Sequence, residues 1–287
     1  MRAVNSRSMA MRVALLLVLQ AALGACTGLA RSAADYARAH GFQEDVTSGS
    51  TFRHRVYRAH TASGSDGALH VYIEGDGSPF AGATLAALDP TPRHPLMLYL
   101  MALDPAPSLY LGRPCYFGLQ SDGVCTARFW TRERFAPEVV DSLASAMLAE
   151  ALRSHASTIE LYAHSGGATL AVLLAARVGI VTRVVTIGAN LDIDAWCALH
   201  GYTPLTGSLN PARLKAPPER VEILHLVGSE DRNTPPSLIE SAVQTGVAGT
   251  VRVIPGYTHA CCWQDIWPGV LSERDGPPRR ETLANRR

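Results

Sequence analysis

The segment Leu161–Ala171, LYAHSGGATLA, leads from one apolar run through a single serine into a second apolar run. The run that begins at Thr158 has the length and composition of a buried strand, and the run after the serine has those of a buried helix. Small residues, Ala163 and Gly167, stand two positions away from Ser165 on either side. A sharp strand-to-helix turn needs such small residues because other backbone packs tightly against it. The segment therefore predicts a strand–turn–helix with Ser165 at its tip.

A serine at such a tip is placed to act as a nucleophile. Its Oγ projects above the carboxyl edge of the sheet, where the amides of the following helix face any oxyanion that forms. The stretch Ala163–Gly167 matches the pattern G-x-S-x-G, with alanine in place of the first glycine. Serine is also common in turns without any catalytic role. The rest of the chain decides between these two interpretations.

A base and an acid follow the serine in the order that this architecture requires. A serine hydroxyl is a weak nucleophile unless a base takes its proton, and the partners follow in the order Ser, Asp or Glu, His. The apolar run Val221–Val227 is followed by Asp231, and the last strand-like run, Thr250–Ile254, is followed by His259. We predict that Ser165 is the nucleophile, His259 the base and Asp231 the orienting acid.

Other histidines and carboxylates compete for these roles. The chain has 10 histidines, so one histidine alone carries little information. His225 lies within its strand and is interpreted as a core residue, whereas the tight turn is expected to point His164 away from the site. Asp192 and Asp194 follow another strand and remain alternative acids.

An oxyanion hole needs two backbone N–H groups that face the carbonyl oxygen of the substrate. Gly166, the residue after the serine, supplies one candidate. The other lies in the loop Glu74-Gly75-Asp76-Gly77, which follows the strand-like run Leu69–Ile73. We predict that the Asp76 amide is this second donor. The Asp76 carboxylate would oppose an oxyanion unless it points away.

Strand-like and helix-like segments alternate after residue 50. The strand-like segments are Thr51–Ala59, Leu69–Ile73, Ser108–Leu111, Thr158–Tyr162, Val181–Ile187, Val221–Val227 and Thr250–Ile254. The helix-like segments are Leu96–Leu103, Pro137–His155, Ala168–Val178 and Pro235–Gln244. This alternation predicts an α/β domain over residues 51–275, with a mostly parallel central sheet and helices on both faces. The Pro- and Gly-rich stretch Leu199–Arg220 is too short for a large lid. Residues 276–287 are charged and are predicted to form a disordered tail.

The N-terminus has the composition of a secretion signal. Basic residues precede the apolar run Val13–Leu23, which ends in Leu23-Gly24-Ala25-Cys26 and resembles a bacterial lipobox. We predict a signal peptide over residues 1–25, lipidation of Cys26, and a tether with one short helix over residues 26–50. An ordinary signal peptide or a retained membrane anchor is the alternative. Thr27 stands where an aspartate would favour the inner membrane, so we expect an outer-membrane protein that faces the periplasm.

The chain has 6 cysteines, and an oxidising compartment favours disulfides among them. Cys115 and Cys125 bracket a short loop and form the predicted pair. Cys197, Cys261 and Cys262 are left without an assigned pairing. His259 with Cys261 and Cys262 could bind a metal, but no second cluster has ligand spacing, so we predict no metal and no cofactor. A dinucleotide site at Gly75-x-Gly77 is disfavoured because Phe80 stands where the third glycine of the motif belongs.

Four stretches add a resemblance to these motifs. They are Tyr72–Gly77, Leu111–Cys115, Leu191–Trp196 and Ser208–Pro211. Together with the serine turn, they resemble bacterial lipoprotein hydrolases of the α/β-hydrolase superfamily. The resemblance implies an α/β-hydrolase fold and a Ser-Asp-His triad, but no particular substrate.

The predicted function is hydrolysis of a carboxylic ester through an acyl-enzyme, with a small acyl ester as substrate. Without a large lid, short or medium acyl chains are favoured. Thioesters and amides use the same triad and stay open. A surface lipoprotein that uses the fold only for binding is the alternative from another class. The net charge is +1 and there is no long basic run, so no nucleic-acid partner is expected.

Overall fold

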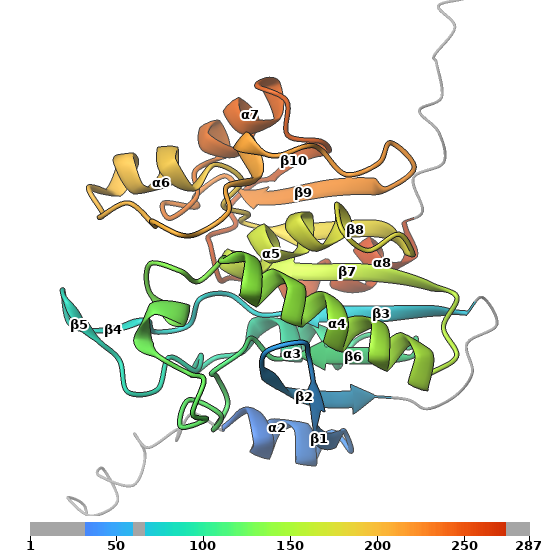
Figure 1. Cartoon of the computed structure of the whole chain (residues 1–287). Helices are drawn as coiled ribbons and strands as arrows, with labels where there is room; N and C mark the ends of the chain where they lie inside the picture. Colours follow the sequence, from blue (N-terminus) through green and yellow to red (C-terminus); the bar gives the residue numbers. More distant parts are fainter. Residues whose placement is uncertain (1–31, 60–66, 274–287) are drawn as a thin grey trace, which may run out of the picture.

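The computed structural model describes residues 32–59 and 67–273 (Figure 1). The predicted signal peptide, Cys26 and the C-terminal tail lie outside the described residues. Within the described ranges, no helix has the length and hydrophobicity needed to cross a bilayer.

Eight strands form one sheet in the order β1-β2-β6-β3-β7-β8-β9-β10. Their bounds are β1 Gln43–Ser48, β2 Arg53–Ala59, β3 Ala68–Ile73, β6 Ser108–Leu111, β7 Thr158–His164, β8 Val181–Ile187, β9 Glu222–Gly228 and β10 Thr250–Ile254. The strands from β6 to β10 in this order are parallel, whereas β2 is antiparallel to both β1 and β6. The predicted mostly parallel sheet is confirmed.

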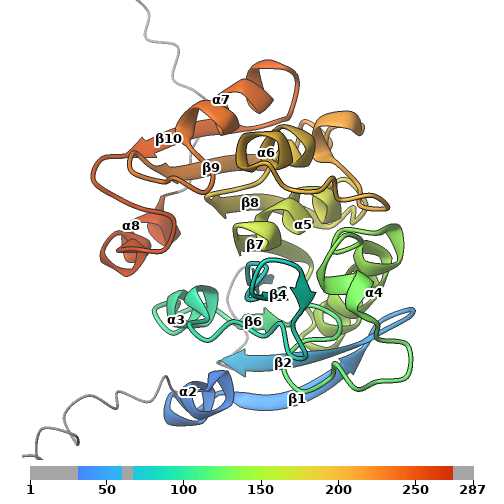
Figure 2. The same ribbon diagram turned by 90° about the vertical axis from the view of Figure 1, so that its left-hand side faces the viewer.

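Helices cover both faces of the sheet, as predicted (Figure 2). On one face lie α4 (Pro137–Arg153) and α5 (Gly166–Ala175), and on the other lie α3 (Leu96–Met101) and α8 (Trp267–Ser272). The remaining helices are α2 (Ala33–Ala39), α6 (Ile193–His200) and α7 (Pro236–Gln244).

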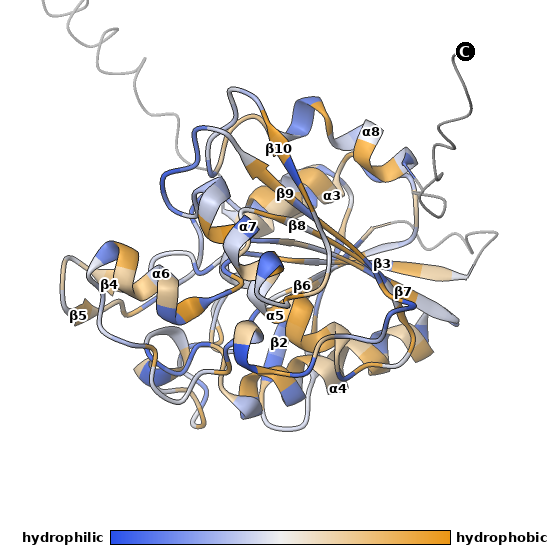
Figure 3. Cartoon of the chain, turned by 90° about the horizontal axis from the view of Figure 1, so that it is seen from above, coloured by the Kyte–Doolittle hydropathy of each residue, from blue (hydrophilic) through white to orange (hydrophobic). Residues whose placement is uncertain are grey.

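Helix α5 and strand β7 form the centre of the core. All ten residues of α5 are buried, and β7 lies between β3 and β8 with six of its seven residues buried. Apolar residues concentrate in these central strands (Figure 3). A helix that is apolar on every side has no face for solvent, so its position against the sheet is fixed by burial.

The parallel strands end at one edge of the sheet. The register pairs Ile73 at the end of β3 with Ala163 of β7, and Gly228 at the end of β9 with Ile254 at the end of β10. The loops that follow β3, β7, β9 and β10 therefore leave the sheet at the same edge. In open α/β sheets this carboxyl edge is where ligands bind.

Four elements differ from the sequence-based prediction. Residues before 50 form the expected short helix, α2, but also strand β1, which we did not predict. The β1 sequence, QEDVTS, is polar and mostly exposed because the strand lies at the sheet edge and pairs only with β2. Helix α6 and a small hairpin, β4 (Phe80–Ala81) with β5 (Leu85–Ala86), were also not predicted.

The predicted Cys115–Cys125 disulfide is present. It closes a loop between cysteines separated by 10 positions. Closing a loop of this size stabilises a fold by about 2 to 3 kcal/mol. Cys261 and Cys262 are bonded to each other, and Cys197 is a buried free thiol. The disulfide between Cys261 and Cys262 leaves neither sulfur as a thiolate, the form in which cysteine binds metals.

Candidate active site

Ser165 lies at the turn between β7 and α5, as the sequence predicts. Its backbone has φ +52° and ψ −123°, a conformation that L-residues rarely adopt. The Ser165 N–H donates to the Ile187 carbonyl of β8 at 2.8 Å, which fixes the turn to the neighbouring strand. Such strain persists only where the surrounding structure enforces it, and it concentrates at functional sites.

The small residues around Ser165 are required by close packing. A Cβ at Gly167 would collide with the backbone carbonyls of Ile73 and Glu74. A Cβ at Gly75 would lie 3.2 Å from the Ser165 Cβ, tighter than most real contacts. The loop after β3 thus passes directly against the serine turn.

Asp231 and His259 are in contact. The His259 Nδ1–H donates to Asp231 Oδ2 at 2.7 Å. The other carboxylate oxygen, Oδ1, accepts the backbone N–H groups of Asn233 at 2.9 Å and Thr234 at 2.8 Å. The Thr234 hydroxyl donates to Oδ2 at 3.1 Å. With these bonds, the buried carboxylate can orient the imidazole and has its own charge compensated.

The same contacts set the protonation states of the pair. Burial raises the pKa of Asp231, but hydrogen bonds from His259 and Thr234 outweigh it and lower the pKa below its usual value. Burial also lowers the pKa of His259, although the bond to Asp231 opposes that shift. Asp231 is therefore ionised and His259 neutral near pH 7, the states that a general base needs.

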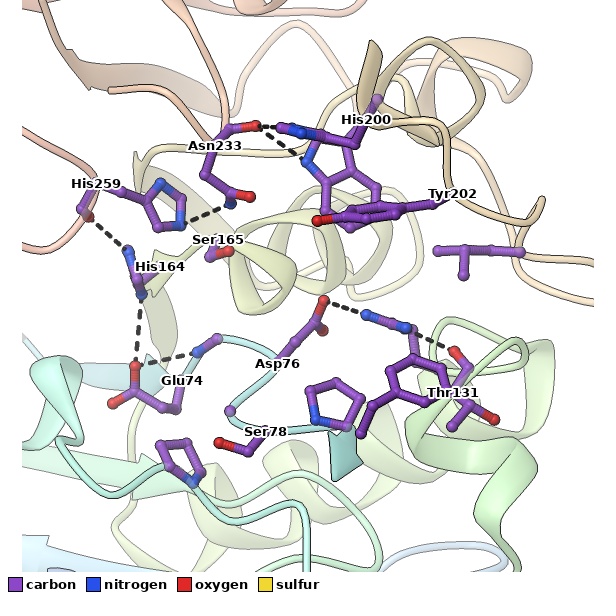
Figure 4. A pocket seen from close by; sticks show the side chains of 18 of the residues that line it. Glu74, Asp76, Ser78, Thr131, His164, Ser165, His200, Tyr202, Asn233 and His259 are labelled. Carbon is purple, nitrogen blue, oxygen red and sulfur yellow. Dashed lines mark hydrogen bonds and ion pairs between the residues drawn. The ribbon is translucent and has the colours of Figure 1, made fainter. Parts of the chain in front are cut away.

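Asn233 is a site residue that the sequence reasoning missed. Its side-chain amide lies 3.1 Å from His259 Nε2 (Figure 4). Since the amide nitrogen is a donor, Nε2 is the accepting nitrogen and the ring proton is on Nδ1. The backbone carbonyl of Asn233 accepts hydrogen bonds from Trp196 Nε1 at 3.0 Å and His200 Nε2 at 2.8 Å. Helix α6 thus holds Asn233 beside the histidine.

The expectation that His164 points away from the site is wrong. Its ring packs against that of His259 at a centroid distance of 4.6 Å, and its Nε2 donates to the His259 carbonyl at 2.9 Å. Its Nδ1 faces buried Glu74 at 3.6 Å (Figure 4). The turn directs the ring sideways into the neighbouring loop, where it supports the backbone of His259.

The loop 74–77 is held at both ends. The Glu74 carboxylate accepts the N–H groups of Gly75 at 3.1 Å and Met97 at 2.9 Å, which ties the loop to α3. Asp76 does not point away from the predicted oxyanion hole. Its carboxylate packs against Gly166, where a Cβ would collide with it. Arg113 and Arg134 both pair with this carboxylate.

The side chains of Asp192 and Asp194 bond to groups at the start of helix α6 and not to His259. Asp192 caps α6 by accepting the N–H groups of Asp194 at 3.1 Å and Ala195 at 3.2 Å. The side-chain amide of Asn210 donates to Asp192 at 2.9 Å and to Asp194 at 2.6 Å. The stretches Leu191–Trp196 and Ser208–Pro211 therefore contact each other and stabilise α6. His225 is a buried core residue, as predicted.

A cavity of about 1260 Å³ opens beside Ser165. It is larger than the roughly 300–1,000 Å³ typical of small-ligand sites. One wall comes from the β4–β5 hairpin and another from α6 and the segment after it, with apolar side chains that include Phe80, Leu96, Trp196, Tyr202 and Leu205. Ser165, His164 and His259 also line it, as do the residues of the loop 74–77.

Comparisons with known proteins identify the fold. No family model matches the sequence, and no curated protein matches it. Three solved structures are similar along most of their length. An esterase from Pyrococcus furiosus has a TM-score of 0.57 at 11% identity, over 81% of this chain and 90% of that chain. An alpha-beta serine hydrolase homologue from Coxiella burnetii has a TM-score of 0.51 at 12% identity, over 80% and 93%. A protein of unknown function from Agrobacterium tumefaciens has a TM-score of 0.50 at 16% identity, over 80% and 91%. The chain therefore has the α/β-hydrolase fold.

The contacts of the three candidate acids give the first prediction. Asp231→Asn is expected to lower kcat on an ester by about 10²- to 10⁴-fold, because the amide no longer fixes the base tautomer. Asp192→Asn and Asp194→Asn are expected to cost less than about tenfold, since neither side chain bonds to His259. Each variant is checked for folding by circular dichroism. A large loss for Asp192→Asn or Asp194→Asn with an active Asp231→Asn protein would reject Asp231 as the acid.

The second prediction concerns pH. A base must be unprotonated to act, so kcat/KM is expected to rise with pH as His259 loses its proton. Burial lowers the pKa of His259 from its ordinary value of 6.5, so the midpoint of this acid limb is expected below 6.5. The kcat/KM profile on a substrate without titrating groups measures it. A midpoint above 6.5 would show that burial does not dominate.

Proposed function

We propose that the protein is a serine hydrolase that cleaves carboxylic esters through an acyl-enzyme. The observation that carries the proposal is that a strained serine turn and the bonded pair of buried Asp231 and half-buried His259 meet at one edge of the sheet, where Ser165 and His259 line the same cavity. A core that needed only packing would gain nothing from a strained serine beside a neutral, oriented imidazole.

In the first half-reaction, the Ser165 hydroxyl attacks the ester carbonyl and His259 Nε2 takes its proton. To do so, Nε2 exchanges the hydrogen bond from Asn233 for one from Ser165. Asp231 stabilises the imidazolium that forms. The Gly166 and Asp76 backbone N–H groups are the proposed donors to the oxyanion. His259 then gives its proton to the leaving alcohol, and the acyl group stays on Ser165.

In the second half-reaction, His259 takes a proton from water, which attacks the acyl-enzyme. The same oxyanion donors act again, and the proton returns to Ser165 as the carboxylic acid leaves. Thioesters and amides are further candidate substrates, since the same groups can attack them. The similarity to an esterase supports the ester as the first choice, and the volume of the cavity supports acyl chains of the short or medium length that the sequence favours, and longer ones as well.

We also propose that Cys26 carries lipid and holds the domain at the outer membrane, facing the periplasm. The support is the apolar run that ends in Leu23-Gly24-Ala25-Cys26. A single acyl chain binds a bilayer only weakly, whereas several chains on one cysteine anchor it stably.

The third prediction tests the nucleophile. Ser165→Ala is expected to lower kcat on p-nitrophenyl acetate by about 10³-fold or more, because only binding and oxyanion effects remain. It is also expected to abolish covalent labelling by a fluorophosphonate. Ser241→Ala, an exposed serine on α7, is the matched control and is expected to keep both.

A folded Ser165→Ala protein with unchanged turnover would reject the mechanism. A wild-type protein that neither hydrolyses p-nitrophenyl acetate nor reacts with the probe would favour the alternative, a non-catalytic lipoprotein that binds through this fold.

The fourth prediction tests the anchor. Cys26→Ser is expected to lose incorporation of a labelled fatty acid and to leave the membrane fraction, because serine lacks the thiol that is acylated. Fractionation of labelled cells measures both. Label retained on the substituted protein would contradict lipidation at Cys26.

A further inference from the structure

Two buried arginines converge on one residue of the predicted oxyanion loop. Arg113 Nη1 pairs with Asp76 Oδ1, and Arg134 Nη1 bonds Asp76 Oδ2 at 2.7 Å. The side chains of Arg113 and Arg134 are 1% and 6% exposed. We call these three residues the Asp76 cluster. Burying three charges is costly, so their retention beside Ser165 calls for a role there.

The arginines are themselves fixed. Arg113 Nη2 donates to the Arg134 carbonyl at 3.2 Å, and Arg134 Nε donates to the Thr131 carbonyl at 2.6 Å. The Tyr116 hydroxyl donates to the Asp76 carbonyl at 3.0 Å. Arg113 and Tyr116 flank Cys115, which the disulfide ties to Cys125. The Asp76 side chain is therefore held by Arg113 and Arg134, and its carbonyl by Tyr116 of the disulfide-closed loop.

This arrangement restrains the backbone of Asp76 next to the nucleophile. The Asp76 carboxylate packs on Gly166, the residue that follows Ser165. A donor is useful to an oxyanion only when it is aimed before the charge forms. With its carboxylate and its carbonyl both bonded, Asp76 is held on two sides of its Cα, and this fixes the position of its backbone nitrogen.

The Asp76 cluster also compensates the negative charge of the Asp76 carboxylate. An isolated carboxylate at this place would raise the energy of a nearby oxyanion. Burial raises the pKa of Asp76, but the charges of Arg134 and Arg113 outweigh it and lower the pKa to about 2, so the group stays ionised. One carboxylate and two guanidinium groups give the cluster a net charge of +1. The Asp76 cluster itself therefore does not oppose an oxyanion.

We propose that Arg113 and Arg134 are positioning residues that act through Asp76: they aim its backbone N–H at the oxyanion and cancel the carboxylate charge beside it. The proposal rests on the proposed hydrolase function. It also links the stretches Tyr72–Gly77 and Leu111–Cys115, because Asp76 of the first pairs with Arg113 of the second.

The test is a double-mutant cycle on p-nitrophenyl acetate hydrolysis with Asp76→Asn, Arg134→Gln and the double variant. Each single change is expected to lower kcat by about 10- to 100-fold with KM within about threefold, because the loss falls on the transition state. Residues that act as a unit are non-additive. The double variant is therefore expected to lose no more than the more impaired single variant.

Two further variants complete the design. Arg53→Gln removes another arginine–aspartate pair, between Arg53 of β2 and Asp122 of the disulfide-closed loop at 2.9 and 2.5 Å, without touching Asp76, and is expected to leave kcat unchanged. Arg134→Lys keeps the charge but cannot bond Asp76 and Thr131 in the same way, so its kcat is expected between those of wild type and Arg134→Gln. It also serves if the Gln variant does not fold.

The outcomes separate this proposal from the proposed function. Wild-type protein that hydrolyses the ester and is labelled by a fluorophosphonate, with unchanged kcat in Arg134→Gln and Arg134→Lys, would overturn the positioning role alone. Multiplicative losses in the double variant would show that Arg134 acts independently of Asp76 and would also overturn it. Wild-type protein that is neither active nor labelled would overturn both proposals.

Discussion

The rest of the site depends on how closely the loop after β3 approaches the turn that holds Ser165. At Gly75 even a methyl group would lie 3.2 Å from the Ser165 Cβ, and at Gly167 it would collide with the end of β3. This contact between two neighbouring parallel strands explains the small residues of the serine motif. In the proposed mechanism, it also brings the Asp76 N–H to the place where the helix α5 amides begin.

Buried charge is the second organising feature. Three carboxylates lie around the serine, and a different set of hydrogen bonds or ion pairs compensates the charge of each. Asp231 is bonded by His259 and by the backbone that follows it, and Glu74 by the amides of Gly75 and Met97. Asp76 is paired with Arg113 and Arg134. Only through such pairing can acidic side chains lie next to a site that is proposed to stabilise an anion.

The parts that sequence predicts well are those written in local patterns. Apolar periodicity located the parallel strands. The order of Ser165, Asp231 and His259 along the chain, with each residue just after a strand, indicated the two side chains that the structure brings into contact. The polar edge strand β1 has no alternation of apolar residues that would predict a strand. It forms a strand because it pairs with β2. Asn233, Arg113 and Arg134 depend on long-range contacts that no local pattern encodes. The predicted direction of the His164 ring was wrong for the same reason, because contacts with Glu74 and the His259 carbonyl determine the direction of the ring.

In the proposed mechanism, Ser165 attacks a carbonyl whose oxygen lies between the Gly166 and Asp76 amides. A crystal structure of the protein after reaction with a fluorophosphonate would locate both groups. We expect a phosphonyl group on Ser165 Oγ, with its oxygen about 2.7–3.1 Å from both backbone nitrogens. An adduct on another residue, or a phosphonyl oxygen that faces solvent away from Asp76, would contradict it.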